Sequence, residues 1–290
     1  MKTSFGPYLE LCKIRIALLS AFSAATGFML STTELSPQII ILILGVFLLA
    51  CGSSALNQYQ ERETDAAMPR TCGRPLPSGR IRQRNALHFS VPLLVSGSSA
   101  LLFTGCLSAP LLGLLAVVWY NGVYTCLKRR TAFAVVPGAL IGAIPPAIGW
   151  ITGGGAVRDP KLLMICFFFF IWQVPHSWLF IMNYGREYEK AGLPSLTMIF
   201  TALQMKRIIF NWIAATAVSC LFLSAIGMVH YFSINIALLL LSSWLLWNGI
   251  KPVLRHSAEY VSLPVFKKTN YYLLAVMLLL SADKLFMLSS

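Results

Sequence analysis

Three oxygen-bearing side chains, spaced four residues apart, follow a long apolar segment of this chain. They are Asn57, Glu61 and Asp65, and on an α-helix they share one stripe because each is rotated by only about 40° from the one before. Carboxylate and amide oxygens are ligands that Mg²⁺ prefers, usually together with substrate phosphate. A solvated helix end, the alternative interpretation, would not need all three groups on one stripe. The spacing therefore favours a divalent metal that holds a phosphorylated ligand.

Basic side chains lie close behind this stripe. Arg70 and Arg74 belong to the segment 69–77, which contains three prolines and a glycine and is therefore predicted to be a constrained loop. Guanidinium groups bind phosphate oxygens in a bidentate manner, so beside carboxylates these arginines favour phosphate recognition. Lys128 and Arg129 end a later apolar segment. Their charges indicate either membrane topology or neutralisation of a leaving diphosphate, and both interpretations remain open.

A second polar group opens the later of two long connections. Glu187 is predicted to be a second metal ligand, and Asn183, four residues earlier, is a further candidate. Two other acids are expected to lie outside the site. On a helix, Glu63 points away from the first stripe, and Glu189 lies about 200° from Glu187.

One histidine, His176, lies inside the sixth apolar segment and more than one turn from its end. Ionisable residues are costly within a membrane, which favours a functional role. A histidine on an apolar helix also serves as a hydrogen-bonded packing residue, and Pro175 beside it frees a backbone carbonyl for such a bond. The sequence supports both interpretations equally.

The composition is that of an integral membrane protein. The 290 residues are 57% hydrophobic and 11% charged, with a mean hydropathy of +0.71, whereas soluble domains carry roughly 25% charged residues. We therefore expect one membrane domain that covers residues 1–290. The seven cysteines form no CxxC motif and are expected to be small hydrophobic residues rather than metal ligands or disulfides. No signal-peptide pattern is present, so the first apolar segment is interpreted as a retained span.

Nine apolar segments approach the roughly 20 residues needed to cross the hydrocarbon core. Helices are predicted for all of them because the backbone must satisfy its own hydrogen bonds in lipid. Glycines and a Pro145-Pro146 pair interrupt the fifth segment and are expected to kink it and open a cavity. The predicted spans lie near residues 14–31, 38–56, 87–105, 109–127, 133–152, 162–182, 208–228, 231–249 and 270–288.

The basic residues determine the expected orientation. Twenty of the 23 Lys and Arg residues fall in the N-terminus and the even-to-odd connections, and only Arg158, Lys161 and Lys284 fall on the other side. By the positive-inside rule, the N-terminus is cytoplasmic and the C-terminus is outside. This bias also accounts for the formal net charge of +13 without nucleic-acid binding. The polar connections 57–86 and about 183–207 are both predicted to be cytoplasmic.

Together these residues resemble the UbiA-type intramembrane prenyltransferases, most closely the branch that farnesylates protohaem IX, the haem O synthases. The resemblance covers nearly the whole chain. It is carried by the first stripe, by Arg70-Thr71-Cys72-Gly73-Arg74-Pro75-Leu76-Pro77, by Tyr124 with Lys128-Arg129-Arg130-Thr131, by Trp172-Gln173-Val174-Pro175-His176, and by Glu187-Tyr188 with Ala191-Gly192-Leu193-Pro194.

The chain departs from the family pattern at three places. The middle of the first motif is usually Asp, and here it is Glu61, which is one methylene longer. The pair of aspartates typical of quinone-pathway relatives is absent from the second motif. After Pro194, Ser195-Leu196-Thr197 replaces the usual hydrophobic-Leu-Pro run.

The resemblance implies an all-α bundle of nine transmembrane helices with a central cavity capped by cytoplasmic loops. It implies farnesyl diphosphate and haem b as substrates in the cytoplasmic (inner) membrane, haem O as product, and Mg²⁺ as the cofactor that assists ionisation of the allylic diphosphate. The implied metal ligands are Asn57, Glu61, Asp65 and Glu187, with Asn183 as the further candidate. The implied substrate-binding side chains are Arg70, Arg74, Tyr124, Lys128, Arg129, His176 and Tyr188.

Two other functions remain open at this stage. A UbiA-type enzyme could prenylate a quinone precursor or another aromatic acceptor, although His176 and the segment after Glu187 favour haem. A transporter would also carry polar groups in a helical bundle, but typically near the midplane and in related repeats. A downstream haem-modifying enzyme is a candidate partner, and no nucleic acid is expected.

Overall fold

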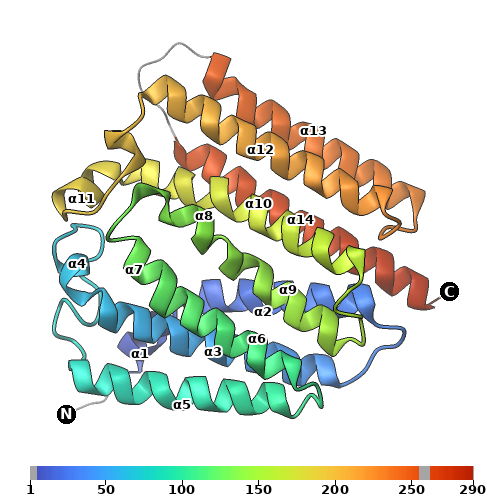
Figure 1. The fold of residues 1–290 in the computed structure, drawn as a ribbon, viewed down its shortest axis with the longest axis horizontal. Helices are drawn as coiled ribbons and strands as arrows, with labels where there is room; N and C mark the ends of the chain where they lie inside the picture. The colour runs from blue at the N-terminus through green and yellow to red at the C-terminus, as the bar shows by residue number, and fades with distance from the viewer. Residues whose placement is uncertain (1–4, 255–261, 290) are drawn as a thin grey trace.

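The computed structural model describes residues 5–254 and 262–289, and these residues fold into a bundle of helices (Figure 1). The helices are α1 (Gly6–Cys12), α2 (Ile14–Ser31), α3 (Gln38–Gln60), α4 (Arg62–Ala66), α5 (Gln83–Leu102), α6 (Ser108–Val117), α7 (Thr125–Leu127), α8 (Val135–Gly138), α9 (Leu140–Thr152), α10 (Pro160–Asn183), α11 (Gly185–Lys190), α12 (Ala202–Ala225), α13 (Phe232–Leu254) and α14 (Ser262–Ser289). A π-helical segment, Val118–Tyr124, joins α6 to α7, and 3-10 turns cover Ala132–Ala134 and Leu196–Met198.

Nine helical stretches in the described part of the chain are long and apolar enough to cross a membrane. Each matches one predicted span, so the all-α membrane fold is confirmed. Several helices extend past the apolar residues that predicted them. The second continues to Gln60 and the seventh begins at Ala202, where Thr201 and Gln204 form a capping box. Hydropathy detects only the apolar part of each helix. The backbone hydrogen bonds of the helix continue into the polar residues at its ends.

The break in the fifth span differs from the expected one. The helix continues through Pro145 and Pro146, which are both buried in α9, and the interruption lies at Ala139, between α8 and α9. The proline pair therefore does not interrupt the helix. Instead, the backbone of Pro146 packs directly against Gly27 of α2.

Helices α2 and α9 pack closely because glycines remove the side chains between them. A Cβ atom at Gly149 would lie 1.8 Å from the carbonyl oxygen of Ala24, and one at Gly27 would lie 2.1 Å from the carbonyl oxygen of Pro146. Small residues at such crossings allow the backbones to approach in a membrane, where no hydrophobic effect drives helix association. This crossing joins the two halves of the apolar core, because α9 contributes Ile148 to one buried cluster and Trp150 to the other.

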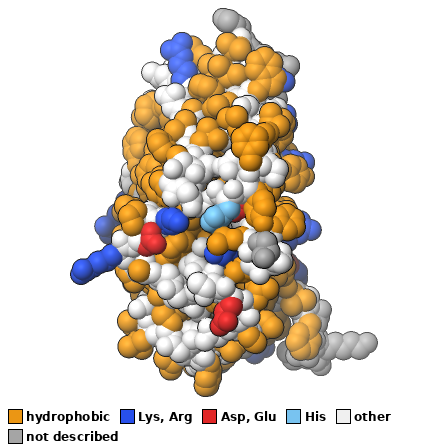
Figure 2. Space-filling view, turned by 90° about the vertical axis from the view of Figure 1, so that its right-hand side faces the viewer, with side chains coloured by type: hydrophobic (Ala, Val, Ile, Leu, Met, Phe, Trp, Pro, Cys, Tyr) orange, Lys and Arg blue, Asp and Glu red, His pale blue; other side chains and the backbone are white. Residues whose placement is uncertain are grey.

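The two long polar connections lie at the same end of the bundle. In Figure 1, α4 and α11 are neighbours at the left, and we call this the α4/α11 end. Figure 2 views the right-hand end of Figure 1, where hydrophobic side chains dominate and charged ones are few. The bundle therefore brings the two polar connections together at one end, although they are far apart in sequence.

Substitution of Gly149 by Ala tests this close packing. We expect the free energy of unfolding to fall by about 1–3 kcal/mol, because the clash is with backbone atoms that cannot rotate away. The measurement is thermal unfolding in detergent, followed by circular dichroism. The matched control is Gly122→Ala, whose Cβ would meet only Val118 Cγ1 at 4.0 Å. Equal unfolding temperatures for the two variants would contradict the packing argument.

Candidate active site

The first polar motif lies at the junction of α3 and α4. Helix α3 ends at Gln60, and Glu61 adopts φ −97° and ψ 6° between the two helices. The four-residue hydrogen bonding nevertheless continues, because Glu61 N donates to Asn57 O at 2.9 Å and Asp65 N donates to Glu61 O at 2.8 Å. The side chains of Asn57, Glu61 and Asp65 are all buried, with 2%, 7% and 1% exposure. The local helical repeat thus keeps the three groups together across the break.

Both carboxylates of this motif are paired with cations from other segments. Arg74, in the loop after α4, donates from one nitrogen to both oxygens of Asp65 at 2.8 and 2.7 Å. Lys128, just after α7, donates to Glu61 Oε1 at 3.0 Å. Buried charges are tolerated when they are paired and hydrogen-bonded. These ion pairs therefore connect the first polar connection to the end of the fourth span.

The pairing changes how Glu61 and Lys128 titrate. Burial alone would raise the pKa of the Glu61 carboxyl, but the Lys128 ammonium, with Lys13 and Arg74 behind it, lowers that pKa below its usual value. Burial would likewise lower the pKa of Lys128, and the carboxylate of Glu61 raises it instead. Each partner therefore keeps the other charged. A charged, buried ammonium is thereby held beside the motif.

Asn57 is surrounded by groups that the sequence analysis did not assign to the site. Its Oδ1 accepts from Lys13 Nζ and from the hydroxyl of Tyr120, both at 3.2 Å, and its Nδ2 donates to Thr125 Oγ1 at 3.2 Å. In the sequence, Lys13 is one of the N-terminal basic residues that determine the expected orientation. Tyr120 and Thr125 gave no signal, because they occupy an otherwise apolar span. Only the folded arrangement brings these groups to Asn57.

Lys13 joins α1 to α2 in an unusual backbone conformation. It has φ 47° and ψ 52°, and it is the one non-glycine residue with positive φ in the described chain. Such left-handed conformations are unfavourable for residues with a Cβ atom and are maintained by surrounding structure. Burial, together with the charge of neighbouring Arg74, lowers the pKa of Lys13 to about 8, although Glu61 opposes the shift. The fold thus holds a third cation, after Arg74 and Lys128, in the site against both strain and desolvation.

The π-helical segment supplies a rigid wall beside this motif. Asn121 donates to Ser53 O at 3.0 Å and to Gln60 Oε1 at 3.1 Å, which fixes the end of α3 against the fourth span. Widened turns of this kind occur frequently at functional sites. Tyr124 stacks on Tyr120 with ring centroids 6.0 Å apart. Its ring fits because Gly138 of α8 has no side chain, since a Cβ there would lie 2.4 Å from the Tyr124 ring.

The second polar connection contacts the first through Arg70. The backbone N–H of Arg70 donates to Glu187 Oε2 at 3.2 Å. Its guanidinium lies over the rings of Phe180 and Tyr184, at 5.0 and 4.8 Å from their centroids. Below this contact, Met68 packs in a buried cluster with Tyr188 and Leu193. The structure therefore brings Glu187 to the loop that carries Arg70.

Three other residues that the sequence assigned to the site are Tyr188, Arg129 and Asn183, and they differ in burial and in contacts. Tyr188 is buried with Lys128 Nζ 5.4 Å from its ring centroid, and Arg129 donates to the Gln60 carbonyl at 2.7 Å. Asn183 is exposed at the end of α10, and the helix is interrupted at Tyr184. The four-residue spacing of Asn183 and Glu187 therefore does not lie on one continuous helix, which removes the helical argument for Asn183.

The two acids that were expected outside the site engage other groups. Glu63 pairs with Arg62 and its side chain is 84% exposed, and Glu189 accepts from Thr197 Oγ1 at 2.6 Å.

His176 lies within α10, where its Nδ1 is 2.6 Å from Oδ1 of Asn270 on α14. The histidine is therefore connected to a second transmembrane helix rather than to the backbone carbonyl freed by Pro175.

The donor atoms of the motif suit a hard cation that arrives with its own ligands. The oxygens of Asn57, Glu61, Asp65 and Glu187 are the type that Mg²⁺ prefers, and Mg²⁺ is usually held by one or two carboxylates plus phosphate. Within the described residues, no three acidic, histidine or cysteine side chains form a compact ligand group. Cations or a backbone N–H engage these acids instead. An incoming anion would attract the same cations.

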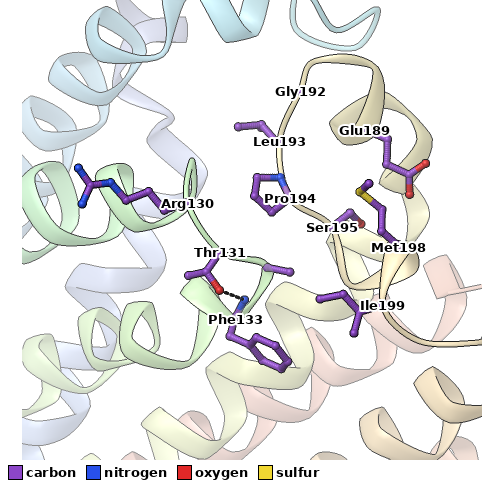
Figure 3. A pocket seen from close by; sticks show the side chains of 11 residues that line it. Arg130, Thr131, Phe133, Glu189, Gly192, Leu193, Pro194, Ser195, Met198 and Ile199 are labelled. Atoms are coloured by element: carbon purple, nitrogen blue, oxygen red, sulfur yellow. Dashed lines mark hydrogen bonds between the residues drawn. The ribbon is translucent and has the colours of Figure 1, made fainter.

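A pocket of about 490 Å³ lies beside this site, between the connection after α7 and the connection after α11. Figure 3 shows Leu193 and Pro194 on one side and Thr131 on the other, with Glu189 of α11 and Met198 at the right of the view. Its lining contains none of the candidate metal ligands. The pocket therefore marks a gap between the two connections and not the ion-paired centre itself.

Comparison with known proteins places the whole chain in one group. The model of the UbiA prenyltransferase family matches residues 18–282. A protoheme IX farnesyltransferase from Geobacter sulfurreducens is 39% identical over 221 residues, which cover 76% of this chain and 82% of that protein. One from Nitratidesulfovibrio vulgaris is 34% identical over 275 residues, which cover 95% of this chain and 94% of that protein.

Solved structures share the fold at low sequence identity. A structure of a UbiA homolog from Archaeoglobus fulgidus bound to GPP and Mg²⁺ superposes with a TM-score of 0.72 at 15% identity, covering 98% of this chain and 100% of that chain. The apo structure of a UbiA homolog from Aeropyrum pernix K1 gives a TM-score of 0.74 at 16% identity, covering 93% and 97%. These likenesses establish the arrangement of the helices.

Replacing Lys13 by Met tests whether its ammonium belongs to the site. We expect the binding of inorganic diphosphate in the presence of Mg²⁺ to weaken about tenfold or more, since charge-assisted hydrogen bonds contribute about 1.5–3 kcal/mol. Calorimetric titration measures the affinity. The control is Arg15→Met, which removes an exposed cation two residues away on α2. Equal diphosphate affinities for the two variants would contradict a role of Lys13 in the site and would leave it only as a charge that sets the membrane orientation.

Proposed function

We propose that this chain, which belongs to the UbiA prenyltransferase family, transfers the farnesyl group of farnesyl diphosphate to a vinyl group of protohaem IX. Two curated relatives that match most of the chain carry that activity in their names. The observation that supports the donor half of the reaction is the ion-paired centre at the α4/α11 end. Its buried acids and cations are suited to a metal-bound diphosphate.

The diphosphate would bind where the cations converge. Lys13, Arg74 and Lys128 are each hydrogen-bonded to a member of the first motif. Arriving phosphate oxygens can share these donors, so the cations need not be desolvated anew on binding. Because they are held in place before the substrate arrives, they can stabilise charge on the leaving group at little reorganisation cost.

Mg²⁺ is the proposed cofactor, and Asn57, Glu61, Asp65 and Glu187 would hold it. When bound, the ion supplies Lewis-acid stabilisation of the negative charge that develops on the diphosphate. The chain contributes the rest of the donor site. Arg70 holds Glu187 through its backbone N–H while its guanidinium stays stacked on two rings. Tyr188, beside Lys128, closes the inner side of the second connection.

The proposed bond changes are balanced without a redox partner. The allylic C–O bond of farnesyl diphosphate breaks and its electron pair leaves with the diphosphate. The π electrons of the haem vinyl group form the new C–C bond, and water then adds to the resulting cation with loss of a proton. The product carries a hydroxyethylfarnesyl group. Partly buried aromatic side chains around the site, such as Tyr120 and Tyr124, would keep bulk water from the first cation.

The chain is a multi-pass membrane protein, and we place the α4/α11 end on the cytoplasmic side of the inner membrane. The positive-inside bias of the basic residues supports this orientation, with the N-terminus cytoplasmic and the C-terminus outside. The centre is then accessible to a water-soluble diphosphate head group, while the farnesyl chain lies among the helices. The apolar composition over 290 residues supports the proposal of a single membrane domain over residues 1–290.

Haem b is favoured over other acceptors. The names of the relatives at 34% and 39% identity support it, and His176 offers a nitrogen ligand inside the bundle. A quinone precursor remains the second candidate because the donor site is independent of the acceptor. A transporter is disfavoured, since the acids lie at one end of the bundle rather than near the midplane.

The activity itself is tested with purified protein, haem b, farnesyl diphosphate and Mg²⁺. We expect haem O, identified by its mass, and we expect Asp65→Asn to lower its rate of formation at least about 100-fold, as for loss of a major electrostatic group in other active sites. Glu63→Gln is the control, because Glu63 is an exposed acid only two residues away. Absence of product, while a relative with known activity produces haem O in parallel, would contradict the proposal.

Removal of the metal provides a separate test. We expect chelation with EDTA to abolish both turnover and the binding of inorganic diphosphate, and re-addition of Mg²⁺ to restore both, because the diphosphate and the four oxygen ligands share the ion. Calorimetric titration with and without EDTA measures the binding. Diphosphate affinity that is unchanged by EDTA would contradict a metal-dependent site.

A further inference from the structure

His176 is held by a side chain of another transmembrane helix. Its Nδ1 lies 2.6 Å from Oδ1 of Asn270, which is 94 residues further along the chain on α14. An amide oxygen only accepts hydrogen bonds, so the histidine proton lies on Nδ1. In a neutral imidazole, the lone pair that can bind a metal is then on Nε2. Asn270 thus determines which ring nitrogen is available.

Two aromatic rings pack against the ring of His176. The Trp172 ring centroid lies 4.7 Å away with the planes at 31°, and that of Phe266 lies 4.9 Å away with the planes at 35°. Trp172 is itself fixed, because its Nε1 donates to the carbonyl of Thr269 at 3.0 Å. Residues of α10 and α14 therefore hold the imidazole together. The ring has one orientation in which it can meet a ligand.

The second ring nitrogen has no protein partner. In the described part of the chain, His176 Nε2 makes no hydrogen bond, and it is not among the sealed buried atoms that lack one. A histidine that serves only in packing normally has both polar atoms satisfied by the protein. Here the His176 side chain is only partly covered, and its Nε2 has no partner among the described residues.

Aromatic contacts connect His176 to the donor site. Phe266 is 5.9 Å from Phe180, Phe180 is 5.0 Å from Tyr184, and the Arg70 guanidinium lies over both of the latter rings. Along α10, the eight residues from His176 to Tyr184 correspond to about 12 Å. A flat apolar macrocycle placed against this wall would have its centre near His176 and its edge toward the diphosphate.

From these contacts we infer that Nε2 of His176 is the axial ligand of the acceptor haem iron, and that Asn270 is the positioning residue which orients the imidazole. The inference rests on the proposed function, since it takes haem as the acceptor. Partners of the second ring nitrogen commonly fix the tautomer and raise the basicity of metal-binding histidines. The amide oxygen of Asn270 raises the basicity of the imidazole only moderately. The resulting bond to iron is therefore weak enough for the haem to leave after the reaction.

Iron ligation would give the acceptor one position in the site. A macrocycle that is bound only by apolar contacts can rotate in its plane and about its axis. A bond from Nε2 to iron fixes its height and tilt, and the aromatic wall then limits the rotation. The reacting vinyl group is thereby held near the prenyl carbon, which is a contribution through proximity and orientation.

The test is haem b binding without farnesyl diphosphate, so that it does not depend on turnover. Wild-type protein in detergent is titrated with haem b, and the ferrous complex is examined by resonance Raman spectroscopy. We expect an iron–histidine stretching band. His176→Ala should abolish this band, and added imidazole should restore an imidazole-bound spectrum. The matched control is His230→Ala, which changes a histidine that pairs with Asp283 instead.

Asn270 is tested by two substitutions with opposite expected effects. Asn270→Asp provides a stronger acceptor and should move the iron–histidine band to higher frequency. Asn270→Leu removes the acceptor, and it should lower the frequency and weaken haem affinity about 10-fold or more. A purely structural residue would change stability without moving the band in opposite directions. The Asp variant keeps the size of the side chain and guards against simple misfolding.

The outcomes separate this inference from the proposed function. An unchanged band in His176→Ala, or a band that the two Asn270 variants leave in place, overturns the inference even if haem O is formed. Failure of the wild-type protein to bind haem b at all contradicts the proposed acceptor and the inference together. Loss of the band with His176 and opposite shifts with Asn270 establish both assigned roles.

Discussion

The ion pair between Lys128 and Glu61 is the interaction on which the arrangement of this end of the molecule depends. The side chains of Lys128 and Glu61 are only 16% and 9% exposed, and each keeps the other charged against the cost of desolvation. A lone charge at this depth would be expensive, so neither segment can move away without leaving an unpaired ion behind. The end of the fourth span is therefore held against the junction of α3 and α4. Lys13 and Arg74 complete the same centre from two further segments.

The close packing of uncharged residues positions the helices that carry this charged centre. Glycines at the crossing of α2 and α9 allow backbone contact between the two halves of the core. The absence of a side chain at Gly138 makes room for the Tyr124 ring, and the π-helical segment directs Asn121 toward the end of α3. These features maintain the helix ends at fixed separations. Charged side chains can then meet with hydrogen-bonding geometry rather than with the looser pairing typical of surface ions.

The proposed donor and acceptor regions share structural elements. Helix α10 carries His176 within the membrane, and its end leads directly to the connection that contains Glu187. Arg70 connects that connection to the first one and also covers the aromatic wall that leads back to His176. One continuous set of contacts thus extends from the ion-paired centre into the interior of the bundle. This continuity is what a reaction between a diphosphate ester and a large apolar acceptor requires.

The sequence by itself determined the nine spans and the groups expected to carry charge chemistry, because lipid imposes a length and an apolar character that composition reveals directly. It also indicated the family, through motifs whose residues are close together in the chain. Only the tertiary structure decided that Lys13, Tyr120 and Thr125 surround Asn57, that the fifth span breaks at Ala139 rather than at its prolines, and that Asn270 orients His176. Those contacts join residues between about 40 and 100 positions apart. Periodicity reports on one helix at a time, whereas the packing of helices against each other determines which side chains meet.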